Sequence, residues 1–199
     1  KLIGVSLNEP NFCVITEYMP LGDLHDVLRK YLSLSWDTKL SFALGIAKGM
    51  EYLHGLSPPI VHRDLKALNV LVDANYQVKV ADFGLSKAIP QEKTQATNTK
   101  MGTLNWLAPE VLSEISPYTT KADVFSYGMV LYEILTGKTP YSGYTPIQIV
   151  RALDSGKRPV LPDGDNKLFC DLIERCWNQD HTKRPEFSEI VNILEEMSM

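Results

Sequence analysis

Four polar residues near the middle of the chain have types that could do chemistry together. Asp64, Lys66 and Asn69 lie within six positions, and Asp82 follows thirteen residues later. Carboxylate and amide oxygens suit Mg²⁺, so we expect Asn69 and Asp82 to hold this ion. Lys66 adds a positive charge where phosphate oxygens would collect. Asp64 is then left to accept the proton of a hydroxyl group.

A short hairpin is the element that must position these residues. Residues 70–72 read Val-Leu-Val and residues 78–80 read Val-Lys-Val, with a turn signal between them. Such β-type runs around a turn predict an antiparallel pair. A hairpin centred on Asn75 brings Asn69 close to Asp82. The predicted magnesium ligands therefore converge at one end of a small sheet.

Length and composition limit the class of protein. The chain has 199 residues, with 44% hydrophobic and 22% charged residues and a net charge of −4. These values are ordinary for a folded chain of one domain or two small ones. The absence of a basic excess argues against nucleic-acid binding. No apolar run approaches the ~18 residues of a membrane span.

The cysteines indicate the compartment. The chain has three cysteines, Cys13, Cys170 and Cys176. A small, odd number cannot form a complete disulfide framework, which suits a reducing, cytoplasmic location. A metal site at Cys170, Cys176 and His181 must be considered. The spacing lacks the short gap of zinc sites, so buried helix cysteines are the default interpretation.

Hydrophobic periodicity predicts strands first and helices afterwards. Apolar runs at residues 2–7 and 12–19, separated by Asn-Glu-Pro-Asn, predict a second hairpin. The polar stretch at residues 89–105 is predicted to be a long functional loop. Spacings of three and four predict helices at residues 23–31, 36–54, 121–136, 145–156 and 166–178, and from Pro185 onward.

Capping residues and apolar faces support these helices. Ser35 and Thr120 are expected N-caps, and Gly55 and Gly137 are expected stops. Thr145 begins a capping box with proline at the first helical position. The buried faces are expected to hold Leu40, Ala43, Leu44, Ala47 and Met50 in the second helix, and Leu168, Phe169, Leu172, Ile173 and Cys176 in the helix at 166–178.

Five motifs in one order resemble the protein kinase family. Residues 62–69 resemble its catalytic loop, and Asp82-Phe83-Gly84 resembles its magnesium motif. Ala108-Pro109-Glu110, residues 123–128 and Arg184-Pro185 resemble the later motifs. The resemblance implies a mainly helical α+β fold. Residues 1–19 would be the end of the small lobe and the hinge, and residues 20–199 the large lobe, including an activation segment at 82–110.

The resemblance also implies a reaction. The γ-phosphoryl group of ATP would pass to a protein hydroxyl, with Asp64, Lys66 and Asn69 as catalytic residues and Mg²⁺ held by Asn69 and Asp82. Asp123 and the Glu110–Arg184 pair would be structural, and His62 would pack beside Phe83. The adenine site would be formed by Thr16, Glu17, Met19 and Leu71.

Finer features indicate the kind of kinase. Lys66 and Gly102-Thr103 resemble serine/threonine kinases, whereas residues 106–110 and Cys176-Trp177 resemble tyrosine kinases. This mixture is typical of the tyrosine-kinase-like group, which mostly phosphorylates Ser and Thr of proteins. A phosphate on Thr97 or Thr99 is expected to pair with Arg63.

Three kinase elements are absent from these 199 residues: a Gly-rich phosphate loop, a strand lysine and a helix glutamate. The chain would then consist of the large lobe and only the end of the small lobe. We therefore expect the chain alone to have negligible kinase activity. The alternative is a non-catalytic interaction module or a truncated isoform. Apolar surface left exposed by the missing part would favour self-association.

Overall fold

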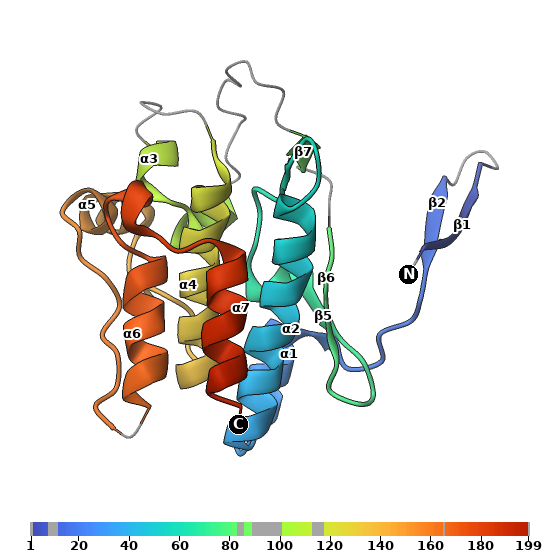
Figure 1. Ribbon diagram of the computed structural model, residues 1–199, viewed down its shortest axis with the longest axis horizontal. Helices are drawn as coiled ribbons and strands as arrows, with labels where there is room; N and C mark the ends of the chain where they lie inside the picture. Colours follow the sequence, from blue (N-terminus) through green and yellow to red (C-terminus); the bar gives the residue numbers. More distant parts are fainter. Residues whose placement is uncertain are drawn as a thin grey trace.

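The computed structural model describes residues 2–7, 12–82, 86–88, 101–112, 118–164 and 166–198. Within these ranges, helices form the body and small antiparallel sheets lie beside it (Figure 1). No helix of the described part is both long and apolar enough to cross a membrane. The helices are α1 (Leu24–Lys30), α2 (Trp36–His54), α3 (Pro109–Leu112), α4 (Thr120–Thr136), α5 (Pro146–Asp154), α6 (Lys167–Cys176) and α7 (Phe187–Glu196).

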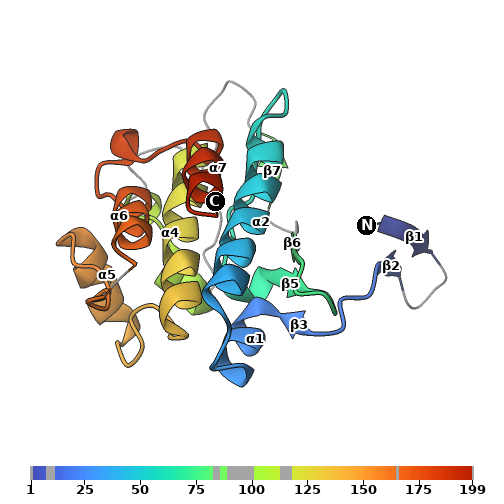
Figure 2. The same ribbon diagram turned by 60° about the horizontal axis from the view of Figure 1, so that its bottom comes forward.

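Helix α4 is the centre of the body. Residues 122–135 are all buried, and α1, α2 and α6 pack around the helix, which Figure 2 shows between α2 and α6. Gly137 ends it at φ 69°, a left-handed conformation that costs glycine little. Because residues 122–135 are buried, the charged residues Asp123 and Glu133 among them must find partners inside the protein.

Helix α2 carries the strand pair of the predicted site. Ser35 caps the helix by accepting a hydrogen bond from the backbone N–H of Thr38 at 3.2 Å. A Cβ atom at Gly45 would lie 2.6 Å from Cγ2 of Val78, and one at Gly49 would lie 3.3 Å from Cγ2 of Val80. The two glycines therefore let the strand lie directly against the helix.

The strand pair has the register that the sequence predicts. Val70 pairs with Val80, and Val72 with Val78. The strands are β1 (Leu2–Ser6), β2 (Cys13–Thr16), β3 (Gly22–Asp23), β4 (Ile60–Val61), β5 (Val70–Val72), β6 (Val78–Val80) and β7 (Lys87–Ala88). Short 3-10 helices are η1 (Ala67–Asn69), η3 (Met101–Trp106) and η4 (His181–Lys183). The sheets are β1-β2, β3-β5-β6 and β4-β7.

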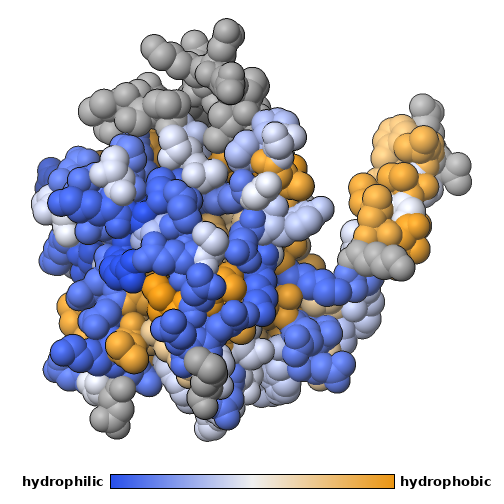
Figure 3. All heavy atoms as spheres, in the orientation of Figure 1, coloured by the Kyte–Doolittle hydropathy of each residue, from blue (hydrophilic) through white to orange (hydrophobic). Residues whose placement is uncertain are grey.

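The hairpin predicted from the apolar runs at residues 2–7 and 12–19 is present as β1 and β2, which pair antiparallel. In Figure 1 it stands to one side of the helical body. Its apolar side chains are exposed, and Figure 3 shows them as a hydrophobic surface away from the body. The exposed apolar residues of this hairpin are Leu2, Ile3, Val5, Val14 and Ile15.

Several local predictions are wrong in detail. Thr119, not Thr120, is the N-cap of α4. Leu168 is 69% exposed, because it lies one position before the buried stripe that begins at Phe169. Leu44 is only partly buried, whereas Phe42 and Ile46 are fully buried, because α2 is covered on more than one side. The end of the predicted loop at 89–105 folds into η3, and residues 89–100 lie outside the described part.

Candidate active site

A buried carboxylate from α4 holds the start of the loop at residues 62–69. Asp123 accepts hydrogen bonds from the backbone N–H groups of His62 at 2.8 Å and Arg63 at 2.9 Å. Nε2 of His54 lies 2.9 Å from the same carboxylate. Arg63 has a φ of 71°, which is uncommon for a residue with a side chain. Asp123 therefore stabilises the tight backbone turn at His62 and Arg63, which is the structural role expected of it.

Asp64, Lys66 and Asn69 meet directly after this turn. The amide nitrogen of Asn69 donates to the backbone oxygen of Asp64 at 2.7 Å and to its Oδ2 at 2.9 Å. Nζ of Lys66 lies 2.7 Å from the same Oδ2. Oδ1 of Asp64 is buried and has no hydrogen-bond partner among the described residues. One oxygen is thus held by two donors, and the other remains to accept a proton.

The donor set around Asn69 fits a magnesium ion. Because the amide nitrogen is bonded to Asp64, the amide oxygen is the atom of Asn69 that remains for a cation. The backbone N–H of Ala81 donates to the backbone carbonyl oxygen of Asn69 at 2.8 Å. This hydrogen bond brings the next residue along the chain, the exposed Asp82, to the same end of the strand pair as Asn69. Asp82 has a φ of 61°. An amide oxygen and a carboxylate at one sheet end are hard ligands of the kind Mg²⁺ prefers.

The residues predicted for adenine lie at the end of β2, in the chain that follows it, and in β5. Thr16 ends β2 and is exposed, and its hydroxyl donates to the carbonyl oxygen of Glu17 at 3.4 Å. The Glu17 carboxylate forms an ion pair with Lys79 of β6, which pairs with Leu71 of β5. Met19 is buried, and its carbonyl oxygen accepts a hydrogen bond from Gly22 at 3.1 Å. The Glu17–Lys79 pair thus links the chain after the hairpin to the sheet that carries Leu71.

The expected Glu110–Arg184 pair is present and bidentate. Nη1 and Nη2 of Arg184 lie 2.6 and 2.9 Å from the two carboxylate oxygens of Glu110. The Arg184 side chain is fully buried and also lies over the ring of Phe125. Parallel hydrogen bonds of this kind have a specific geometry. They connect α3 to the C-terminal part of the chain.

Two parts of the buried polar network were not predicted. His54 reaches Asp123, yet nothing in its local sequence indicates a distant carboxylate. Glu133 accepts a hydrogen bond from Nε1 of Trp106 at 2.8 Å and lies 3.3 Å from Nδ1 of His25. Burial raises the pKa of Glu133 to about 7. A glutamate within the otherwise uncharged, largely apolar run at residues 129–135 is a signal that could have found it.

Some predicted residues cannot be placed. Phe83, Thr97 and Thr99 lie outside the described residues, and so does the side chain of Thr103. The packing of His62 on Phe83 therefore stays a prediction, although Nε2 of His62 lies 3.0 Å from the carbonyl oxygen of Ala81.

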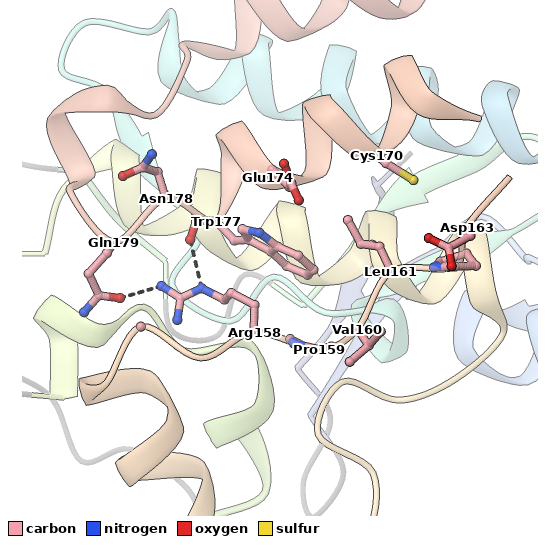
Figure 4. Close-up of a pocket in the computed structure, with 12 residues that line it drawn as sticks. Arg158, Pro159, Val160, Leu161, Asp163, Cys170, Glu174, Trp177, Asn178 and Gln179 are labelled. Carbon is pink, nitrogen blue, oxygen red and sulfur yellow. Dashed lines mark hydrogen bonds between the residues drawn. The ribbon is translucent and has the colours of Figure 1, made fainter. Parts of the chain in front are cut away.

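A groove of about 610 Å³ lies between the segment at 156–163 and the end of α6 (Figure 4). None of the catalytic-loop residues lines it. Cys170 lines the groove, and burial raises the pKa of its thiol, which disfavours a reactive thiolate. Arg158 lies at one end and donates to the carbonyl oxygen of Trp177 at 2.9 Å. The groove is therefore separate from the candidate active site.

Comparisons with known proteins agree with this geometry. Residues 1–194 match the family described as protein tyrosine and serine/threonine kinase. The chain is 45% identical over 200 residues to serine/threonine-protein kinase STY46 of Arabidopsis thaliana, covering 100% of this chain and 34% of the relative. It is 44% identical over 198 residues to serine/threonine/tyrosine-protein kinase HT1 of the same plant, covering 98% of this chain and 50% of the relative.

The chain therefore belongs to the protein tyrosine and serine/threonine kinase family. It spans about a third of the length of STY46 and half that of HT1. The family and the tyrosine-kinase-like character predicted from the motifs are confirmed. So is the α+β fold, a kinase large lobe with part of the small lobe. Members of this family use ATP and Mg²⁺ in general and act on proteins.

Proposed function

We propose that the protein containing this chain is an ATP-dependent serine/threonine protein kinase, and that residues 64–69 and Asp82 are its phosphotransfer site. The arrangement around Asp64 is the observation that carries the proposal. Its Oδ2 is held by Lys66 and Asn69, while its buried Oδ1 has no partner in the described part of the chain. A scaffold has no need for a carboxylate in this state.

Each residue then has a distinct task. Oδ1 of Asp64 orients the hydroxyl group of the substrate and accepts its proton. Lys66 lies beside that carboxylate and stabilises the transferred phosphoryl group. Asn69 and Asp82 would hold Mg²⁺, which would neutralise charge on the triphosphate. The catalytic contribution of the chain is mostly positioning and electrostatic stabilisation.

The adenine ring is proposed to bind where β2 ends. The backbone of Glu17 and Met19 would meet the edge of the ring, and Thr16 would lie at the mouth of the pocket. Leu71 would form the floor. The ion pair between Glu17 and Lys79 supports this placement, since it holds the chain after β2 against the strand beside Leu71.

The proposal is tested by phosphotransfer from radiolabelled ATP with Mg²⁺ to a mixture of proteins, using the intact protein. We expect label on serine and threonine, dependence on Mg²⁺, and a large loss in Lys66→Ala. Lys183→Ala is the matched control, because this lysine is exposed. No transfer by a folded wild-type protein would instead support the alternative, a non-catalytic interaction module. We expect negligible transfer by the 199 residues alone.

Activation by phosphorylation is proposed at Thr97 or Thr99. The Arg63 guanidinium is buried and lies over the ring of Tyr118, and its Nε and Nη2 have no hydrogen-bond partner among the described residues. A phosphate would supply the missing acceptors. Full activity in a Thr97→Ala, Thr99→Ala double variant of the intact protein would contradict this proposal.

Two further proposals concern the surroundings of the chain. A cytoplasmic location is proposed, since three cysteines are too few for a disulfide framework and an odd, sparse count suits a reducing compartment. Self-association through the exposed apolar side chains of β1 and β2 is also proposed. Light scattering of the 199 residues alone tests it: Val14→Asp should reduce the mass, and a monomer of the unmodified 199 residues would contradict it.

A further inference from the structure

Glu133 is a buried carboxyl group to which the proposed reaction assigns no task. Its side chain is 1% exposed and lies in the last turn of the buried helix α4. Moving a charged carboxylate out of water is costly unless a cation is paired with it. Arg29 is the nearest candidate cation, but its guanidinium donates to the carbonyl oxygen of His25 at 2.9 Å and to Oγ1 of Thr139 at 2.6 Å. Glu133 is therefore left with a histidine as its ionisable contact in the described part of the chain.

Three elements meet at this carboxyl group. Oε2 accepts the indole N–H of Trp106, which lies in η3 directly before Leu107 and the Ala108-Pro109-Glu110 motif. Oε1 lies 3.3 Å from Nδ1 of His25 in α1. The backbone of Ala67, inside the catalytic loop, also donates to the carboxyl group. One side chain thus connects α1, the catalytic loop and the segment that leads into α3.

The contact with His25 requires a proton. A carboxylate oxygen and an unprotonated ring nitrogen both present lone pairs, which cannot face each other at 3.3 Å. When the pair holds two protons, the carboxyl group of Glu133 donates one to Nδ1 and the ring carries the other on Nε2. When the pair holds one proton, the neutral ring carries it on Nδ1 and donates it to the carboxylate. In the second case Glu133 is charged, and its hydrogen bonds from Trp106 and Ala67 become charge-assisted and stronger.

We infer that Glu133 is a positioning residue that shares a proton with His25, and that loss of the second proton of this pair tightens its hold on Trp106 and the catalytic loop. The described charged groups around the pair are Asp23, Asp26 and Arg29 on or beside α1. Asp23 and Asp26 favour the protonated state and Arg29 opposes it. The part concerning catalysis rests on the proposed function, whereas the shared proton does not.

The sign of the linked stability change follows from the direction of the pKa shift. Burial raises the pKa of Glu133 from 4.5 to about 7, so between these values the folded chain binds a proton that the unfolded chain has released. Stability from this group is complete below pH 4.5, declines as the pH rises, and is lost above about 7. His25 acts in the opposite direction, because desolvation lowers its pKa.

The test follows the indole N–H signal of Trp106 by nuclear magnetic resonance between pH 5 and 8.5 in the intact protein, assigned with Trp106→Phe. In the wild type the signal should move with a midpoint near pH 7. In Glu133→Gln, which keeps an acceptor oxygen, it should not titrate. Glu195→Gln is the control at an exposed carboxyl group. A Trp106 titration that persists in Glu133→Gln overturns the inference.

Two further measurements keep the inference falsifiable. Relative to Glu133→Gln, the unfolding equilibrium constant of the wild type should rise by up to about tenfold per pH unit between pH 5 and 7. If Glu133→Gln does not fold, the same titration of the Trp106 indole signal is carried out in His25→Phe. A pH midpoint equal to that of the wild type would show that no proton is shared. Neither measurement needs phosphotransfer, so an inactive protein could still confirm the shared proton. In an active protein, the inflection of kcat near pH 7 should disappear in Glu133→Gln.

Discussion

The catalytic loop and the β1–β2 hairpin both carry predicted site residues, but they are held in opposite ways. The loop is buried, and its backbone is bonded to Asp123 of α4, about sixty residues away. The hairpin presents apolar side chains on its surface, and its described link to β6 is the partly exposed pair of Glu17 and Lys79. The position of the loop is therefore set by a buried hydrogen-bond network within this chain. The exposed ion pair at the hairpin contributes little to the free energy of unfolding.

The comparison separates two kinds of site residue. Asp64, Lys66 and Asn69 contact one another, so their geometry depends on contacts that the chain itself supplies. Thr16 and Glu17 lie at the edge of a hairpin whose surface is still apolar and exposed. Their final placement depends on what packs against that hairpin. Substitutions in the two regions should therefore differ strongly in their effect on stability.

The largest effect on the free energy of unfolding is expected at the buried Glu110–Arg184 pair. Arg184→Met leaves the Glu110 carboxylate without its bidentate partner, and should lower the free energy of unfolding by about 3–5 kcal/mol. Urea denaturation measures this loss. The matched control is Arg175→Met, whose exposed pair with Glu189 should contribute at most about 1 kcal/mol. Equal losses in the two variants would contradict the comparison.

A somewhat smaller effect is expected at the anchor of the catalytic loop. Asp123→Asn removes a charge that accepts two backbone N–H groups and contacts His54. We expect a loss of about 2–4 kcal/mol, since hydrogen bonds to charged groups are strong and unsatisfied buried donors are costly. Denaturation of Asp171→Asn, an exposed carboxylate on α6, provides the control. A loss below 1 kcal/mol would show that the loop does not depend on α4.

The smallest effect is expected on the hairpin. Val5 and Val14 are paired across β1 and β2 and are 62% and 68% exposed. Replacing both with Thr should change the free energy of unfolding by no more than about 0.5 kcal/mol. The same urea series tests this. A loss above 1 kcal/mol in the intact protein would mean that another surface covers these side chains.

The sequence predicts local features well and long-range polar contacts poorly. The register of β5 and β6 follows from two short valine-rich runs, and the capping box at Thr145 follows from four adjacent residues. Both depend on interactions between near neighbours. His54 and Glu133, in contrast, acquire their roles only when α2, α4 and α1 pack together. The contacts of Asp123 and of the Glu110–Arg184 pair were expected only because the motifs resemble a known family.

The exposure of Leu168 illustrates the same limit within one helix. The periodicity of α6 places the apolar stripe correctly at Phe169, Leu172 and Ile173, but not the edge of that stripe. The edge depends on which neighbouring segments cover it. Spacing along one helix therefore predicts that a buried face exists, and packing decides its width.

The central claim is that Asp64 accepts the proton in a phosphotransfer reaction. Its most direct test is kcat for transfer from ATP to a protein serine or threonine in the intact Asp64→Asn variant, with Asp171→Asn as control. Circular dichroism should show that the variant remains folded. We expect kcat to fall by about 10²–10⁴-fold, the usual contribution of a positioned base. A folded Asp64→Asn variant with kcat within threefold of the wild type would contradict it.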